Sequence, residues 1–305
     1  MIHIIITSYG ELNSTEKAIK SFLDQKITKP FKIIVADPYT ETKWMLEEKF
    51  FNEKKIEYFE DEDKGKSYAL NMLMKKIDSK KIDDIIIFSD GDVYVGNNSV
   101  NEILKKFEDP NVGCVCGRPI SLNKKSNMLG YWSHVAFEEM NSTRKRLSNS
   151  KEFFEVSGYL FAIRNGIIKS FPIGASEDNV IPMLIRKNEY KVEYAERAEV
   201  FVMSPKNFNE WKTQKNRNIK GHLALRRVIG HFDKRKNTIF GEAWRGLSFF
   251  FKYPNNIKEY FWYVLMAFSR LYVWMSAAFE TDILEKKYSD GWRSEENLKT
   301  TKIDD

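Results

Sequence analysis

The stretch IIIFSDGDVYV, residues 85–95, decides the fold that we expect for this chain. Its four consecutive large apolar residues indicate a strand buried on both faces, as in a parallel sheet covered by helices. The run ends at Asp90-Gly91-Asp92, so two carboxylates follow the C-terminal end of the strand. Ligands of open α/β sheets bind at that edge, and carboxylate oxygens suit a divalent cation and its phosphates. A DGD triplet also makes solvated turns, so the rest of the chain must decide between a site and a turn.

Composition and charge narrow the class of protein. Of 305 residues, 42% are hydrophobic and 30% charged, which is typical of a globular chain with one large α/β core or two modest domains. The net charge is +6, and residues 206–252 hold 12 Lys and Arg against 3 Asp and Glu, whereas residues 1–205 hold 30 against 31. A basic excess in one region favours phosphate or an anionic membrane surface, not nucleic acid, as the partner.

The N-terminal run and the cysteines favour a cytosolic protein. Residues 1–7, MIHIIIT, have no basic segment, and their apolar run is too short for a signal peptide. Cys114 and Cys116 have strand spacing and share one face, so we interpret them as reduced core residues.

Strands alternate with helices over the first 120 residues. Besides the central strand, we expect strands at residues 2–6, 31–36, 56–59 and 112–116, with amphipathic helices between them. This alternation predicts a mostly parallel, doubly wound, Rossmann-like sheet. No GxGxxG follows the first strand, so the dinucleotide fingerprint is missing.

Capping signals and turn residues place the other elements. Asn13 or Ser14 is the expected cap of the first helix, and Ser99 with Glu102 forms a capping box before another helix. For the second half we expect the following elements: a long helix at 127–145, an extended run at 153–163, a helix opened by 176–179, and two short strands at 192–194 and 199–203.

Charged residues follow the other strands at the same edge. Asp37 precedes Pro38, which disfavours a helical conformation and holds the carboxylate extended. Gly65-Lys66-Ser67 opens a helix, but a Walker A loop needs a glycine where Glu60 stands, so a P-loop is rejected. Lys64 and Lys66 either contact phosphate or ribose at the helix N-terminus or belong to a solvated helix start.

A carboxylate that holds a metal ion cannot also accept a proton, so hydroxyl activation needs a separate group. Asp178 lies at the predicted start of a helix, where the dipole favours its ionised form. Asp178 could therefore accept a proton from a substrate hydroxyl.

The order of these segments resembles the inverting glycosyltransferases of family 2, which have the GT-A fold. The resemblance covers about residues 1–225 and rests on six short motifs: residues 7–11 (TSYGE), Asp37, residues 64–71 (KGKSYALN), residues 90–92, residues 158–164 and Glu177-Asp178. It implies a Rossmann-like α/β sheet flanked by helices, and transfer of a sugar from a UDP- or GDP-linked donor to an acceptor hydroxyl with inversion.

The resemblance also implies roles for the matching residues. The nucleotide-sugar would be bound by Thr7, Tyr9, Glu11, Asp37, Lys64, Lys66, Asp90 and Arg217, with Asp37 at the base. Asp92 would hold Mn²⁺ or Mg²⁺ on the diphosphate, and Asp178 would be the catalytic base. The acceptor side would include Gly158, Tyr159 and Glu177. A cation on the diphosphate stabilises the leaving group while the base activates the incoming hydroxyl.

Three positions leave alternatives open. The sequence ADPY at residues 36–39 departs from the family's usual pattern after the second strand, so it does not decide between uracil and guanine. Gln214-x-x-Arg217 is similar to the QxxRW element of processive members, but Asn218 replaces the tryptophan. We expect Arg217 to clamp phosphate in a non-processive enzyme; the alternative is a basic amphipathic helix. His222 is either a third metal ligand or a histidine outside the ligand set.

Residues 226–305 are expected to form a basic and aromatic helical extension of the catalytic domain. Residues 260–279 are aromatic-rich with a single charge, Arg270, whose insertion into a bilayer centre costs about 2.5–3.5 kcal/mol. We expect helices that lie on the cytoplasmic face of a membrane, which would suit a lipid-linked acceptor. Packing on the catalytic domain and a spanning helix are the alternatives.

Two other functions compete with sugar transfer. A sugar-1-phosphate nucleotidyltransferase shares a nucleotide-binding sheet, but it needs a Gly- and Arg-rich loop after the first strand, where this chain has Tyr9-Gly10-Glu11. A membrane-associated scaffold with a degenerate fold has no need of intact Asp92 and Asp178. The donor sugar, the acceptor and the linkage are not determined by the sequence.

Overall fold

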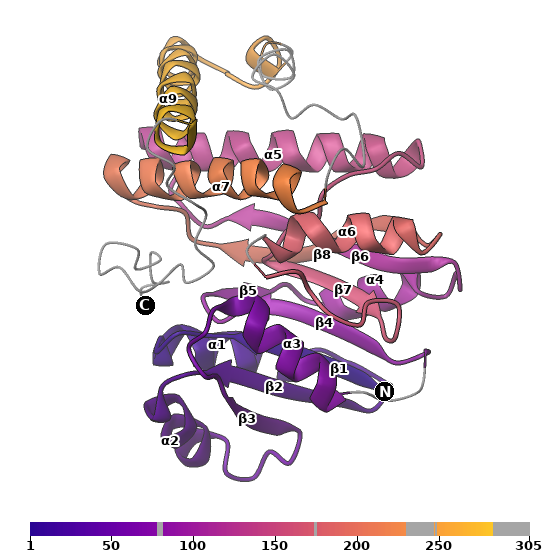
Figure 1. Ribbon diagram of the computed structural model, residues 1–305. Helices are drawn as coiled ribbons and strands as arrows, with labels where there is room; N and C mark the ends of the chain where they lie inside the picture. Colours follow the sequence, from indigo (N-terminus) through magenta and orange to yellow (C-terminus); the bar gives the residue numbers. More distant parts are fainter. Residues whose placement is uncertain (78–81, 174–175, 230–246, 248, 283–305) are drawn as a thin grey trace.

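A central sheet organises the protein. The computed structural model describes residues 1–77, 82–173, 176–229, 247 and 249–282, apart from the side chains of residues 222–229 and 281–282. The strands are β1 (Ile2–Thr7), β2 (Phe31–Asp37), β3 (Ile56–Glu60), β4 (Ile85–Asp90), β5 (Val93–Val95), β6 (Val112–Ser121), β7 (Leu160–Arg164) and β8 (Lys191–Val202). They form one eight-stranded sheet in the order β3-β2-β1-β4-β7-β6-β8-β5 (Figure 1). The first four are parallel, β6 pairs parallel with β8, and β7 and β5 are antiparallel to their neighbours.

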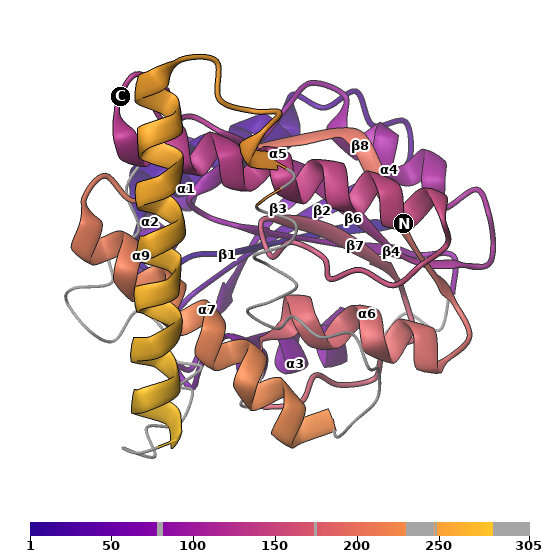
Figure 2. The ribbon, with the colours of Figure 1, turned by 90° about the horizontal axis from the view of Figure 1, so that it is seen from above.

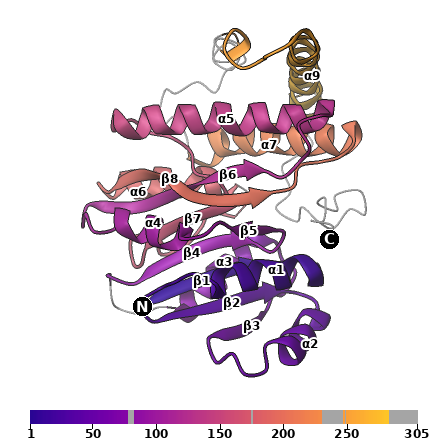
Figure 3. The same cartoon turned by 180° about the vertical axis from the view of Figure 1, so that it is seen from behind.

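Helices cover both faces of this sheet. They are α1 (Leu12–Leu23), α2 (Thr40–Lys49), α3 (Lys66–Ile77), α4 (Ser99–Lys106), α5 (Met128–Asn149), α6 (Glu177–Lys187), α7 (Phe208–Ile229) and α9 (Ile257–Asp282). One apolar core joins α1, α2 and α4 to one face of the sheet (Figure 3). A second core joins α3 and α6 to the other face. The expected α/β architecture, a mostly parallel sheet flanked by helices, is confirmed.

A third layer lies beyond the β6–β8 end of the sheet. Helix α5 packs on β6 and β8, and α9 crosses the N-terminal halves of α5 and α7 (Figure 2). Its contact is built on Tyr263, Met266, Val273 and Ala277, all buried against the other two helices. The expected C-terminal helical extension is therefore present and packs on α5 and α7. No helix in the described part of the chain combines the length and apolar character needed to span a bilayer.

The strand β4 holds the central position that its sequence predicts. All six of its residues are buried, and it pairs with β1 on one side and β7 on the other. The register sets Thr7 beside Asp90, so the polar ends of β1 and β4 are adjacent. Cys114 and Cys116 are free and buried in the core, as expected.

Several local expectations were wrong. Helix α1 begins at Leu12, directly after Glu11, so Asn13 and Ser14 lie inside it. The residue before α4 is Asn98 in a left-handed conformation, and the Ser99 hydroxyl donates to the Glu199 carbonyl instead of capping the helix.

Strand lengths differ from the expected ones in the second half. The two short strands expected at 192–194 and 199–203 are one strand, β8, which pairs with β6 across an irregularity. Within the extended run expected at 153–163, only residues 160–163 are strand, and they belong to β7, Leu160–Arg164. The boundary drawn after residue 225 falls inside α7.

Candidate active site

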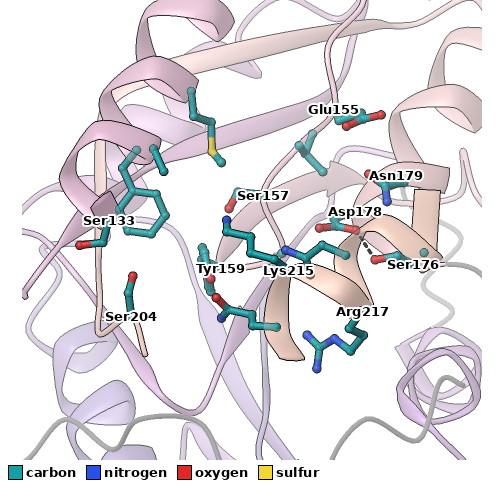
Figure 4. A pocket seen from close by; sticks show the side chains of 18 of the residues that line it. Ser133, Glu155, Ser157, Tyr159, Ser176, Asp178, Asn179, Ser204, Lys215 and Arg217 are labelled. Carbon is teal, nitrogen blue, oxygen red and sulfur yellow. Dashed lines mark hydrogen bonds between the residues drawn. The ribbon is translucent and has the colours of Figure 1, made fainter. Parts of the chain in front are cut away.

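A pocket of about 260 Å³ opens at the C-terminal end of β4. Its lining comes from the β4–β5 turn, the start of α3, residues 155–159, and helices α5, α6, α7 and α9. Figure 4 shows part of this lining from close by. Eight of the residues singled out from the sequence line it: Lys66, Asp90, Asp92, Gly158, Tyr159, Glu177, Asp178 and Arg217. Segments far apart in sequence thus bring most of the expected chemistry into one cavity.

Lys66 links two carboxylates at the centre of the site. Its Nζ lies 2.7 Å from Asp90 Oδ1 and 2.7 Å from Glu177 Oε1, so it joins β4 to α6. Burial alone would lower the pKa of Lys66, but the charges of Asp90 and Glu177 and their hydrogen bonds outweigh it and raise this pKa above its ordinary value. Lys66 is therefore a fixed cation at the pocket wall.

The turn after β4 fits tightly against the β1 loop. Thr7 Oγ1 donates to Asp90 Oδ1 at 3.2 Å, and the Gly91 N–H donates to the Thr7 carbonyl at 2.7 Å. A Cβ on Gly91 would lie 2.9 Å from both Ser8 Cβ and Thr15 Oγ1. Glycine is required here by this close approach, which holds both acidic side chains at one edge.

Asp37 organises the loops at the ends of β1 and β2. Its carboxylate is fully buried and accepts from the Gly10 N–H at 2.9 Å and the Tyr39 N–H at 2.8 Å. The Tyr9 ring packs edge-on against Tyr39 at 5.0 Å between centroids, and Glu11 is buried at the start of α1. These residues lie at the same sheet edge but do not line the pocket, and Asp37 holds together the loops that follow β1 and β2.

Lys64 is placed differently from Lys66. Its side chain is 58% exposed, pairs with Glu62 and lies 5.0 Å from the Tyr68 ring centroid. It does not line the pocket. Of the two expected lysine contacts, the structure brings only Lys66 into the cavity.

Asp178 lies in the first turn of α6. Ser176 Oγ donates to its Oδ1, and a Cβ built on Gly158 would lie 3.6 Å from its Oδ2 (Figure 4). Burial, followed by the charges of Asp92 and Asp90, raises the pKa of Tyr159, so its phenol stays protonated at neutral pH and can donate a hydrogen bond. Gly158, Tyr159 and Asp178 thus form one edge of the pocket, with a carboxylate available as a proton acceptor.

Most of the remaining wall was not expected from the sequence to belong to the site. Helix α5 presents residues at helical spacing, and other elements add Glu155, Lys215 and Arg270; the α5 residues are Trp132, Ser133, Ala136, Phe137, Met140 and Arg144. In Figure 4, Lys215 lies between Tyr159 and Asp178. The i, i+4 spacing along residues 132–144 was the available signal, but the same spacing is typical of any packed helix.

The acidic edge suits a cation that shares its ligands with a phosphate. Within the described residues, no three His, Cys, Asp or Glu side chains gather into a closed metal site. Mg²⁺ in nucleotide sites takes one or two carboxylates and completes its shell with phosphate and water oxygens. Asp90 and Asp92 at the pocket wall fit that requirement. The side chain of His222, the other expected ligand, lies outside the described residues.

The fold and pocket define an α/β protein with an acidic sheet edge facing a carboxylate on a helix. The family profile described as "Glycosyl transferase family 2" matches residues 3–171, more than half of the chain. The chain belongs to glycosyl transferase family 2. No curated protein matches it in sequence.

Solved structures share the fold at low sequence identity. The crystal structure of GalNAc-T7 with UDP, GalNAc and Mn²⁺ is similar with a TM-score of 0.50 and 16% identity, over 67% of this chain and 43% of that one. The S. aureus TarS 1–349 complex with UDP-GlcNAc is similar with a TM-score of 0.50 and 12% identity, over 89% of this chain and 81% of that one. The chain thus spans less than half of the GalNAc-T7 chain, and these likenesses show the GT-A fold.

Proposed function

We propose that this protein transfers a sugar from a nucleotide-diphosphate donor to an acceptor hydroxyl with inversion. The observation that carries the proposal is the shared pocket of Asp92, at the end of β4, and Asp178, at the start of α6. One carboxylate would serve the diphosphate end of the donor, and a separate one the acceptor. UDP in the GalNAc-T7 structure and UDP-GlcNAc in the TarS structure support a UDP-linked donor, with GDP as the alternative.

The donor would lie along the ends of β1, β2 and β4. Asp37 would hold the loop that binds the nucleotide base. Thr7, Tyr9 and Glu11 would flank the bound nucleoside, and Lys64 would lie on its solvent side. Lys66 and Arg217 supply positive charge to the diphosphate, and Asp90 contacts ribose or water. When Mn²⁺ or Mg²⁺ is bound at Asp92, it supplies charge that stabilises the leaving diphosphate.

Asp178 would accept the proton of the acceptor hydroxyl. The hydroxyl oxygen then bonds to the anomeric carbon while the bond from that carbon to the diphosphate oxygen breaks, so the nucleoside diphosphate leaves with the electron pair. Attack from the opposite face inverts the anomeric centre. Gly158, Tyr159 and Glu177 border the acceptor side, and Gly158 leaves room beside the Asp178 carboxylate.

The assigned roles predict that two substitutions affect different quantities, turnover in one case and metal-dependent UDP affinity in the other. Asp178→Asn removes a proton acceptor, so turnover should fall by about 10²–10⁴-fold while the Kd for UDP stays within about twofold. Asp92→Ala removes a ligand, so the gain in UDP affinity on adding Mn²⁺ should shrink. Calorimetry with UDP and a transfer assay after a screen of UDP- and GDP-sugars give both readouts.

Other outcomes favour the competing functions. A degenerate scaffold predicts that no nucleotide-sugar binds and that Asp92→Ala changes nothing. A sugar-1-phosphate nucleotidyltransferase predicts release of pyrophosphate from a nucleoside triphosphate. Equal loss of turnover and UDP affinity in Asp178→Asn would contradict the base assignment.

We also propose that residues 1–225 carry the donor chemistry and that the extension places the protein on the cytoplasmic face of an anionic membrane, with a glycan or lipid-linked acceptor. The outer face of α9 carries a stripe of exposed apolar side chains: Phe261, Val264, Phe268, Leu271, Met275 and Phe279. Exposed Lys252 and Lys258 lie near one end of this helix. An apolar stripe next to lysines suits an interfacial helix.

Vesicle binding tests this placement. Phe268→Asp should reduce cosedimentation with anionic phosphatidylglycerol vesicles, because it puts a charge on the stripe. Trp44→Asp is the matched control, since Trp44 on α2 is 60% exposed and Phe268 is 66% exposed. Equal binding by both variants, or none by the wild type, would contradict the proposal.

A further inference from the structure

One cation in the pocket wall has no counter-charge. Arg144 of α5 is 6% exposed and borders the pocket. Its Nε donates to the Glu155 carbonyl at 3.0 Å, whereas its Nη1 is buried without a hydrogen-bond partner. Across the described residues, no carboxylate forms an ion pair with this guanidinium.

A second buried arginine in the same protein, Arg164, has hydrogen-bond partners and a counter-charge. Arg164, also 6% exposed, donates to the carbonyls of Val112, Phe107 and Asp109 and stacks on the Phe107 ring. It also pairs with Asp83. Burial of a charge costs free energy unless partners compensate for it, and Arg144 lacks this compensation. The guanidinium is therefore prepared for a partner that comes from outside the chain.

Arg144 lies next to the acceptor side of the pocket. Arg144 donates to the carbonyl of Glu155, three residues before Gly158. A Cβ built on Gly158 would face the Asp178 carboxylate. Arg144 and Asp178 both line the pocket. Phe137 and Met140 of α5 line the pocket together with Arg144 and provide an apolar surface on which a sugar ring can pack.

We propose that Arg144 binds an anionic group of the acceptor, a phosphate or a carboxylate, while the acceptor presents its hydroxyl to Asp178. The planar guanidinium can donate two parallel hydrogen bonds to either group. This inference rests on the proposed function for the identity of the bound molecule as the acceptor. It adds a substrate class: the acceptor is a charged sugar or a charged glycan unit.

Calorimetry with three matched sugars tests the proposal. Glucose, glucuronate and glucose 6-phosphate are titrated into the protein in saturating UDP and Mn²⁺, so that the diphosphate site is filled. One anionic sugar should bind at least about tenfold more tightly than glucose, and whichever does so identifies carboxylate or phosphate as the preferred group. Equal affinities for all three sugars would overturn the proposal.

Variants of Arg144 assign the preference to this side chain. Arg144→Met should abolish the preference and leave the Kd for UDP within about twofold. Arg146→Met, two residues along α5 at an exposed arginine, is the matched control and should keep the preference. Retention of the preference in Arg144→Met would overturn the assignment.

A second variant separates binding from folding. If Arg144→Met does not fold, Arg144→Lys keeps the charge and should weaken the anionic sugar several-fold, because an ammonium cannot donate in a bidentate manner. An unchanged affinity in Arg144→Lys would then overturn the proposal. Failure of the proposed function has a different signature: UDP would not bind, yet the anion preference, measured without UDP, would still depend on Arg144.

Discussion

The buried lysine in the pocket wall allows a sharp test of the structure. Lys66→Met keeps the length of the side chain and removes the ammonium that lies 2.7 Å from both Asp90 and Glu177. Each of these pairs has a Coulomb energy of about 6 kcal/mol at an effective dielectric constant of about 20. Desolvation of the ammonium offsets much of this attraction. Removing one partner of a buried pair therefore costs about 3–5 kcal/mol, since it leaves two carboxylates without their cation.

Urea unfolding followed by circular dichroism measures this loss. With an m-value of about 3 kcal/mol/M, the midpoint should fall by about 1–1.7 M. Because the pKa of Lys66 is raised above its ordinary value of 10.5, the contribution is complete below about pH 10.5. It is lost only as the pH rises through the folded-state pKa, so measurements at pH 7 and pH 8 should agree.

Two further variants show whether the pair is responsible. Lys64→Met removes a lysine two residues away that is exposed and paired only at the surface, so we expect no measurable shift of the midpoint. In a Glu177→Gln background, Lys66→Met should cost about 0.5–3 kcal/mol less, because one unpaired carboxylate is already gone. Equal midpoints for the two lysine variants, or strictly additive costs in the double variant, would refute the reasoning.

Three other substitutions test close contacts and burial. Gly158→Ala puts a methyl group 3.6 Å from Asp178 Oδ2, which is an ordinary contact, so the protein should fold normally. The methyl group takes space beside the carboxylate, so kcat/KM in a transfer assay should fall about 10²-fold. Full activity would show that no acceptor passes this carboxylate. Gly130→Ala should destabilise by about 1–3 kcal/mol in thermal unfolding, although alanine favours helices, because its Cβ would lie 2.0 Å from the Lys124 carbonyl; a raised Tm would contradict this approach. Burial lowers the pKa of His3, so protonation of its ring costs stability as the pH falls below about 6.5. His3→Leu should therefore reduce the loss in urea midpoint between pH 7.5 and 5.5. Parallel pH profiles of the two proteins would contradict this effect.

Local patterns predicted the elements whose stability is local. The apolar run at residues 85–88 and the apolar faces of α1 and α3 are buried as their periodicity indicates. The capping predictions failed where tertiary contacts compete for the same hydroxyl. Ser99 donates to Glu199 of β8, 100 residues away, and no pattern around Ser99 contains that strand. The division of β8 failed likewise, since pairing with β6 continues across the irregularity near Arg118.

The candidate site was predictable where strands end and not where helices pack. Asp90 and Asp92 follow an apolar run, so their position at the sheet edge is encoded in sequence. Arg144 stands in the stretch STRKRL, residues 142–147, where charges are typical of a solvated helix face. Only the packing of α5 on β6 and β8 places this arginine in the interior, and that packing is a long-range property. The sequence predicted Asp37 from its position at the end of a strand. Its two backbone partners, the N–H groups of Gly10 and Tyr39, depend on the conformations of the loops after β1 and β2.

Two tryptophan side chains in the pocket wall should make the intrinsic fluorescence of the protein sensitive to what occupies the pocket. Trp132 and Trp211 both line the cavity, with their centroids 5.1 Å apart, and both are nearly shielded from water. Shielded indoles emit at short wavelengths, and a hydroxylated or charged occupant changes the polarity and quenching around them. Substrate entry on this side should thus be visible in the intrinsic emission spectrum without any label, which makes continuous stopped-flow recording of acceptor capture practical.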